Sequence, residues 1–347
     1  MNIRSELSAR LNNEIKRKCT TPQRISSKAK LPQEVIEGYL TAEREIQFDE
    51  LRPICESLKI GLMWLLSPNY KPSHLTFRAL ADQDLTKVSR IENTFLIIGD
   101  VLPQIKKFTV PKLNTSEKDP AMLQAETNKA SSDLRQAYPT VESLYEAAGL
   151  PILPVSAGNN GFDAFIMDSG KSSVVCVNKD KPSPRIHFSL LHEMAHFLWH
   201  RGQDVPVDVS IEGYFNNNLI ADNQIPEYVA NKFAQQFIFS LNEIKDIASK
   251  WKNFNAGELI AERRTTVDVL AFAIHDYLLF TAKPAQFVQI RDALKANIST
   301  SYRQDGTLLD FIEKRGNNLK SMLLHNKEEF SNSVWSEVNN AWELGVD

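Results

Sequence analysis

The residues with the clearest chemistry are His192, Glu193 and His196, which form a His-Glu-x-x-His pattern. On a helix the two histidines are separated by about 40° around the axis and about 6 Å along it, so both rings can reach one metal ion. Glu193 lies about 60° from His196, on the same side of the helix. The pattern therefore predicts a metal site with a carboxylate beside it that is not itself a ligand.

The carboxylate of Glu193 is placed for proton transfer. Zinc lowers the pKa of bound water to about 7, and a neighbouring carboxylate can take the released proton and pass it to a leaving amine. This chemistry is metal-assisted amide hydrolysis, for which the pattern is a known signature. The same residues can also occur by chance on an ordinary helix, so the surrounding sequence has to support the site.

A catalytic zinc site usually needs a third protein ligand. His200 is unsuitable because it lies about 9 Å along the helix from an ion held between His192 and His196. We expect it to be a structural residue or an outer-sphere partner instead. The acidic candidates further along the chain are Glu212, Asp222, Glu227 and Glu243.

Glu227 is the favoured acid because it begins a segment with helical periodicity and follows Pro226, which suits a first helical turn. Asn231 lies one turn later on the same face. The carboxylate can then bind the metal while the amide hydrogen-bonds a ligand histidine and fixes its tautomer. The alternative is that Glu227 is an ordinary acid at a helix N-terminus, stabilised by the helix dipole.

Two short runs near the metal helix predict a β-hairpin. Residues 173–177 are β-branched and lead towards the helix, and residues 163–167 form the other expected strand. We expect the edge of strand 173–177 to lie beside the metal, where an extended peptide adds as a further strand. This part of the chain is therefore predicted to be a small α+β unit.

The segment from His192 to His200, followed by Glu227-x-x-Ala-Asn-x-Phe-Ala, resembles the ImmA/IrrE family of metallopeptidases. The resemblance covers about residues 135–285. It implies that His192, His196 and Glu227 bind the metal and that Glu193 is the general base. Zinc is the expected metal and manganese the alternative.

The resemblance also implies a protein substrate, often a transcriptional repressor, and cleavage that stress such as DNA damage switches on. Ser240 stands where the family usually has a proline, and we expect this difference to alter the helix exit and leave the chemistry intact.

In related peptidases a segment like 257–277 packs over the metal helix. His275 and Tyr277 are therefore candidates for a transition-state hydrogen bond, with ordinary core and surface roles as the alternative.

Residues 1–68 predict a separate all-helical domain. Apolar residues at Ile3, Leu7, Leu11 and Ile15 mark one face of a first helix, and Thr21-Pro22 has the form of a helix start. Further helices are expected over residues 33–40, from Asp49, and around residues 62–66. Over about residues 3–66 the segment resembles the XRE class of helix-turn-helix repressors.

The candidate DNA contacts are Arg24, Lys28, Lys30 and Gln33. The three basic residues belong to a stretch, residues 16–30, that contains six basic residues and no acid and can contact phosphates. Gln33 is the best side chain for base recognition. Against this, Glu34 and Glu37 repel a phosphate backbone, and Pro22 stands where the family usually has a phosphate-contacting glutamine. DNA binding is the favoured interpretation, and a bundle that docks protein or forms a homodimer is the alternative.

The remaining segments are expected to be supporting structure. Residues 69–134 predict a helical connector over 74–106 and a polar linker over 107–133, and residues 286–347 predict a C-terminal helical region without visible chemistry. The predicted fold class is mostly α, with a small α+β metallopeptidase domain and an N-terminal all-α helix-turn-helix domain.

Composition agrees with a cytoplasmic protein. The chain has 347 residues, a net charge of −3 and three cysteines without disulfide or metal spacing. It has neither an apolar run of about 18 residues nor a signal-peptide pattern, so we expect no membrane association. The low net charge does not indicate a particular partner.

Two functions from different classes agree with these features. The first is a regulatory zinc-dependent endopeptidase that cleaves a transcriptional repressor or an antitoxin in a stress or mobile-element response, with an N-terminal domain that binds DNA or docks the target. The second is a transcription factor or antitoxin whose metal site is structural or regulatory and which performs no proteolysis.

Overall fold

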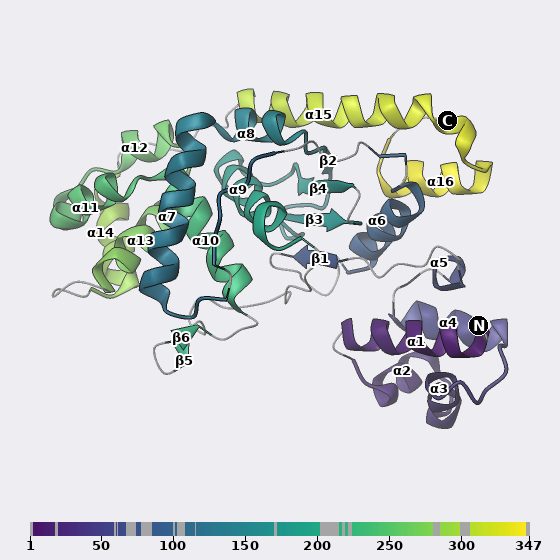
Figure 1. The fold of residues 1–347 in the computed structure, drawn as a ribbon. Helices are drawn as coiled ribbons and strands as arrows, with labels where there is room; N and C mark the ends of the chain where they lie inside the picture. Colours follow the sequence, from purple (N-terminus) through teal and green to yellow (C-terminus); the bar gives the residue numbers. More distant parts are fainter. Residues whose placement is uncertain are drawn as a thin grey trace. The chain divides into compact units, whose positions relative to one another are not determined.

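The structure is a computed structural model of the chain, and it describes residues 3–17, 20–58, 60, 62–66, 74–77, 85–99, 101–102, 108–114, 116–169, 172–201, 215–216, 219–220, 224–279, 285–298 and 306–344. This part is mostly helical and contains one small mixed sheet (Figure 1). It divides into two units, residues 1–74, 81–102 and 323–347 in the first and residues 75–80 and 103–322 in the second. The predicted mostly helical fold class with a small α+β domain is confirmed.

The first unit begins with five short helices that enclose their own hydrophobic core. Leu11, Ile25, Ile36 and Leu51 are buried at its centre. The helices are α1 (Ile3–Arg17), α2 (Pro22–Ala29), α3 (Gln33–Leu40), α4 (Phe48–Leu58) and α5 (Leu62–Leu66). The N-terminal part is all-helical, as predicted.

The start of α2 is capped in the way that the sequence indicates. The Thr21 hydroxyl accepts a hydrogen bond from the Arg24 amide at 3.3 Å, and Pro22 occupies the first turn, where its missing N–H costs nothing. At the other end Lys30 adopts the left-handed region with φ of 55°, and its amide bonds the Ser26 carbonyl. A short turn then leads directly into α3.

A second pair of helices belongs to the first unit. Helix α6 (Leu85–Ile98) packs against α16 (Asn332–Ala341), and the Trp342 indole donates to the Ile91 carbonyl at 3.2 Å. The sequence analysis had grouped residues 323–347 with the rest of the C-terminal region. Apolar periodicity marks which face of a helix is buried but not which distant helix covers that face, so it could not reveal this pairing.

The sheet lies in the second unit and has the strand order β1-β3-β4-β2. The predicted hairpin is confirmed, since β3 (Ala164–Asp168) and β4 (Ser173–Asn178) pair antiparallel, with Ala164 opposite Val177. Strand β2 (Ile152–Val155) pairs parallel on the other side of β4, with Ile152 opposite Val175. The expectation that residues 173–177 offer a free edge beside the metal is therefore wrong, because β4 is paired on both sides.

Strand β1 (His74–Phe77) is the other neighbour of β3. A helix was predicted here because the apolar residues of the segment fit a helical period. A four-residue run fits several periods equally well, and pairing with β3 decides its conformation.

Helix α9 (Ser183–Trp199), which carries the His-Glu-x-x-His pattern, packs on β3 and β4. Two ion pairs, one near each end of the helix, show its direction relative to β3. Near its start, Arg185 Nε lies 2.8 Å from Oδ2 of Asp163, just before β3, and past its end Arg201 Nη2 lies 3.2 Å from Oδ1 of Asp168, the last residue of β3. The metal helix thus runs alongside β3 in the same direction.

The polar linker expected over residues 107–133 is largely replaced by helix α7 (Pro120–Ala137). The Asp119 carboxylate accepts a hydrogen bond from the Ala121 amide at 2.8 Å and caps its start. Leu123 and Leu134 are buried on one face, and the helix packs against α10 (Ile225–Ile238). The segment looked like a linker because its exposed face is strongly polar, yet a narrow apolar face was enough for packing.

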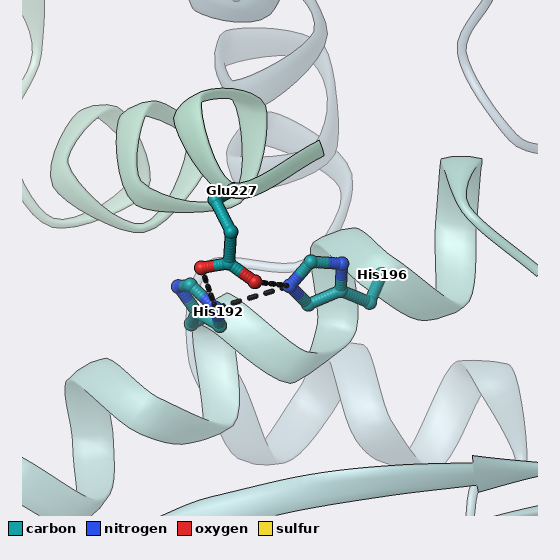
Figure 2. Close-up of side chains that lie close together, drawn as sticks. All are labelled: His192, His196 and Glu227. Carbon is teal, nitrogen blue, oxygen red and sulfur yellow. Dashed lines mark hydrogen bonds and ion pairs between the residues drawn. The ribbon is translucent and has the colours of Figure 1, made fainter. Parts of the chain in front are cut away.

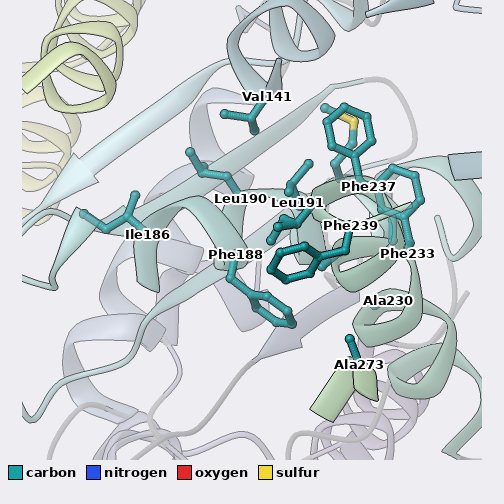
Figure 3. Packing of buried hydrophobic residues seen from close by; sticks show 14 of the residues in the cluster. Val141, Ile186, Phe188, Leu190, Leu191, Ala230, Phe233, Phe237, Phe239 and Ala273 are labelled. Carbon is teal, nitrogen blue, oxygen red and sulfur yellow. The ribbon is translucent and has the colours of Figure 1, made fainter. Parts of the chain in front are cut away.

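The main hydrophobic core is built from side chains of the sheet and of the helices around it, among them Val141, Leu191, Phe233 and Ala273 (Figure 3). This core holds α9 and α10 against each other. The remaining helices of the second unit are α8 (Val141–Ala148), α11 (Leu241–Lys250), α12 (Gly257–Glu262), α13 (Val267–Leu279), α14 (Phe287–Ala296) and most of α15 (Gly306–His325), and a short strand pair is formed by β5 (Phe215–Asn216) and β6 (Leu219–Ile220).

Candidate metal centre

Three side chains from two helices converge on one point in the second unit. His192 and His196 come from α9 and Glu227 comes from the first turn of α10 (Figure 2). The Nε2 atoms of the two histidines lie 3.0 Å apart, and each lies 3.3 Å from one oxygen of the Glu227 carboxylate. All three ligand atoms lie within 4.8 Å of one another, so one ion can be bound by all of them.

The helices place these groups through local sequence features. The histidines are one turn apart, and Pro226 lets α10 begin immediately before the carboxylate. Glu227 sits at the positive end of the α10 dipole, which stabilises its charge. Packing between α9 and α10 then brings the two motifs together.

Burial and charge at the centre favour a cation. All three residues are buried: His192 is 0% exposed, His196 2% and Glu227 7%. Burial by itself raises the pKa of Glu227, but the adjacent His192 and His196 outweigh burial and hold that pKa well below its ordinary value. The carboxylate is therefore charged in a buried position, where a charge needs a partner. Two imidazoles, which are neutral when they ligate a metal, and one carboxylate suit a divalent transition metal such as zinc.

The other ring nitrogen of each histidine faces a second side chain. Nδ1 of His192 lies 3.1 Å from Oδ1 of Asn231, and Nδ1 of His196 lies 3.0 Å from Nδ1 of His200. These contacts leave both Nε2 atoms directed at the metal position. His200 faces the outer side of His196, which agrees with its exclusion from the metal shell on geometric grounds. Burial is the main reason that the pKa of His200 lies well below 6.5, and the neighbouring His196 lowers this pKa further, so the ring is neutral.

Glu193 is fully buried on α9, next to the first ligand. Tyr145, on α8, donates a hydrogen bond from its hydroxyl to the Leu190 carbonyl of α9 at 2.8 Å. Burial raises the pKa of Tyr145 well above its ordinary value, and the charge of Glu193 raises it further. Tyr145 was not among the residues predicted for the site, because a tyrosine on a short amphipathic helix carries no signal that it will pack against the metal helix.

Two other predicted site residues, His275 and Tyr277, have contacts of their own. His275 Nδ1 is 3.6 Å from an oxygen of Asp276, and its ring packs edge-to-face on Phe287. Tyr277 packs at the margin of the hydrophobic core. Neither is a member of the metal-binding group, and their role as transition-state hydrogen-bond donors stays a prediction.

Of the remaining downstream acids, only Glu243 lies within the residues that the structure describes, and it does not belong to the metal-binding group. Glu243 caps α11, where the Ser240 hydroxyl and amide bond its carboxylate at 2.6 and 2.7 Å. Ser240, the departure from the family pattern, thus begins the next helix. Glu212 and Asp222 lie outside the residues that the structure describes.

The candidate DNA contacts are placed on α2, the following turn and α3. Arg24, Lys28 and Lys30 are exposed. Gln33 is half-buried, and its amide donates to the Glu37 carboxylate at 2.7 Å. The basic residues are therefore accessible, while the proposed base-recognition side chain is engaged by an acid on its own helix.

Residues 146–267 match the family model of the IrrE N-terminal-like domain, Peptidase_M78. The matched region contains all three metal-binding residues and Glu193. This region is therefore similar to IrrE-like metallopeptidase domains, and it holds a group fit for a metal ion that includes both histidines of the His-Glu-x-x-His pattern. Comparison with curated proteins and with solved structures found no match. Among the described helices none has the length and apolar character needed to span a membrane.

Proposed function

We propose that this chain is a regulatory zinc-dependent endopeptidase that cleaves a transcriptional repressor or an antitoxin in a stress or mobile-element response. The observation that carries the proposal is the buried convergence of His192, His196 and Glu227 within a region that matches the IrrE N-terminal-like domain. Glu193 stands beside this group on the same helix. The arrangement supports hydrolysis of an amide bond.

Each residue has a role in this proposal. His192, His196 and Glu227 hold the metal, and Asn231 orients the ring of His192. When bound, zinc supplies Lewis-acid polarisation of the amide carbonyl and acidifies water. Glu193 takes a proton from the attacking water on its carboxylate and returns it to the leaving amine. Burial of the centre strengthens these interactions, because the surrounding dielectric is low.

The regulatory character of the proposal rests on the N-terminal part. A five-helix segment with exposed Arg24, Lys28 and Lys30 accompanies the peptidase domain in one chain. An appended domain of this kind suits the selection of one target and is not needed for general protein digestion. We propose that it brings the peptidase to DNA or to a target protein bound there.

The test compares the wild-type chain with Glu193→Gln, which removes the base but keeps the shape of the side chain. Each is co-expressed with the product of the adjacent gene, with and without DNA damage. We expect a cleavage product in the wild-type cells alone and about one zinc per chain in both purified proteins, measured by elemental analysis together with manganese. Undiminished cleavage by the Glu193→Gln variant would remove the peptidase proposal.

A transcription factor or antitoxin with a structural or regulatory metal site is the second candidate, favoured by the exposed basic residues of α2 and its turn. Its test is a mobility-shift assay on promoter DNA with the full chain and with an Arg24→Ala, Lys28→Ala, Lys30→Ala variant. DNA binding that weakens in the variant and with added salt, without proteolysis of any partner, supports this candidate. Failure of the wild-type chain to bind its own promoter rejects it and leaves protein docking as the role of the segment.

A further inference from the structure

His200 contacts the metal-binding group through His196. It is 2% exposed, the two ring centroids lie 5.1 Å apart, and the two Nδ1 atoms are separated by 3.0 Å. Two nitrogens at this distance form a hydrogen bond when one carries a proton and the other offers a lone pair. The contact therefore couples the tautomer of one ring to that of the other.

The position of the metal-binding group fixes the direction of this hydrogen bond. His196 directs Nε2 towards Nε2 of His192 and the Glu227 carboxylate, so Nε2 is its ligand atom and must have a free lone pair. A neutral His196 then carries its proton on Nδ1. Nδ1 of His200 is the acceptor of that proton, which leaves the proton of His200 itself on Nε2.

The far side of the His200 ring favours neither tautomer. In the part of the chain that the structure describes, Nε2 of His200 is buried and has no hydrogen-bond partner. Neither a donor nor an acceptor among the described residues therefore fixes the proton at Nε2. Among the described contacts, the hydrogen bond to His196 selects between the two forms.

The other metal ligand is held in the same manner by a different chemical group. Nδ1 of His192 faces the Oδ1 atom of Asn231 at 3.1 Å. The side-chain oxygen of asparagine, Oδ1, and the Nδ1 atom of histidine are both bonded to Cγ, so they lie at the same distance along their side chains. An asparagine at position 200 would thus place an acceptor close to where the histidine places its own.

We propose that His200 is a positioning residue of the metal site, which accepts the Nδ1 proton of His196 and holds that ring in the tautomer that leaves Nε2 free for the metal. The inference rests on the metal site of the proposed function and does not require proteolysis. It predicts that His200 affects metal affinity without contacting the metal.

The test measures zinc affinity of the full chain by competition with a chromophoric chelator. His200→Phe keeps the ring volume and removes the acceptor, and His200→Asn restores an acceptor at the same position. The matched control is His187→Asn, because His187 is a buried histidine of α9 whose Nδ1 faces the Arg264 carbonyl at 3.0 Å and which is not a member of the metal-binding group.

We expect His200→Phe to weaken zinc binding about 10- to 100-fold, as is typical when an outer partner of a ligand histidine is lost. His200→Asn should recover most of the affinity, and His187→Asn should match the wild type. Wild-type affinity in the phenylalanine variant, or an asparagine variant as weak as the phenylalanine one, would overturn the proposal. If His200→Phe does not fold, His200→Leu takes its place.

A spectroscopic measurement on the unaltered protein is independent of any variant. Histidine ring ¹⁵N spectra of the zinc-loaded chain should show the proton of His200 on Nε2 and that of His196 on Nδ1. The reverse assignment at His200 would reject the proposal. If these results hold while no substrate is cleaved, the peptidase proposal fails and the role of His200 stands.

Discussion

Oδ1 of Asn231 lies 3.1 Å from Nδ1 of His192, one helical turn along α10 from Glu227. The second motif helix therefore supplies both a metal ligand and the group that orients a ligand of the first helix. Because one rigid helix carries both groups, a displacement of α10 against α9 would disturb two of the three ligands together.

Replacing Asn231 with leucine should weaken zinc binding. The substitution removes the acceptor for the His192 Nδ1 proton and leaves the ring free to rotate or change tautomer, for which a loss of about 10- to 100-fold in affinity is typical. Chelator competition measures the effect. Asn231→Asp keeps an acceptor and should bind zinc more tightly than the leucine variant, and equal affinity in the two would contradict the orienting role.

Removing the metal should lower the stability of the second unit. An ion that binds the folded state alone stabilises it by about 2.7 kcal/mol when its free concentration is one hundred times the dissociation constant. Thermal unfolding should therefore shift to lower temperature with a chelator and recover with zinc. Glu227→Gln lacks the charged ligand, so its unfolding temperature should respond little to either addition; a full response would exclude Glu227 as a ligand.

Acid should weaken the junction between α10 and α11. Burial raises the pKa of Glu243, but hydrogen bonds from Ser240 and the charge of Arg263 outweigh it and lower this pKa below 4.5. A lowered pKa means that Glu243 contributes stability above its unfolded pKa and loses it as the pH falls through the folded value. Chemical denaturation from pH 7 towards pH 3 should show a smaller loss in Glu243→Gln than in the wild type.

Ser240→Ala provides a companion measurement at the same junction. The serine hydroxyl accepts a hydrogen bond from the Glu243 amide at 3.2 Å, so its removal should cost about 1 kcal/mol of stability at neutral pH. An unchanged denaturation midpoint would mean that the cap contributes nothing.

Gly316→Ala should destabilise the packing of α15 on the sheet. A Cβ at this glycine would lie 2.6 Å from Cγ and Cδ of Pro154 in β2, so the helix or the strand must shift. Overpacking of this kind typically costs about 1–3 kcal/mol and opposes a helix-propensity gain of about 1 kcal/mol. Gly306→Ala in the same helix is the control, since none of the described residues outside its own stretch of helix has an atom within 4 Å of its Cβ. A Gly316→Ala variant as stable as the control would reject this contact.

Much of the candidate site follows from local sequence. The spacing of His192 and His196 fixes their common helical face, and the order of Pro226, Glu227 and Asn231 fixes a helix start with two polar groups one turn apart. The five N-terminal helices are also local features, defined by caps and apolar periodicity. These predictions succeeded because neighbours along the chain determine helical geometry.

Tertiary packing decided the rest. Periodicity could not show that β4 is paired on both sides, that residues 120–137 form a helix against α10, or that Tyr145 hydrogen-bonds the metal helix at Leu190. Nor could spacing show which nitrogen of His200 faces His196. The physical reason is the same in each case. The local sequence sets which surface of a helix or strand is apolar and which is polar. The segment that covers each surface comes from a distant part of the chain, and its identity depends on how all the surfaces pack together.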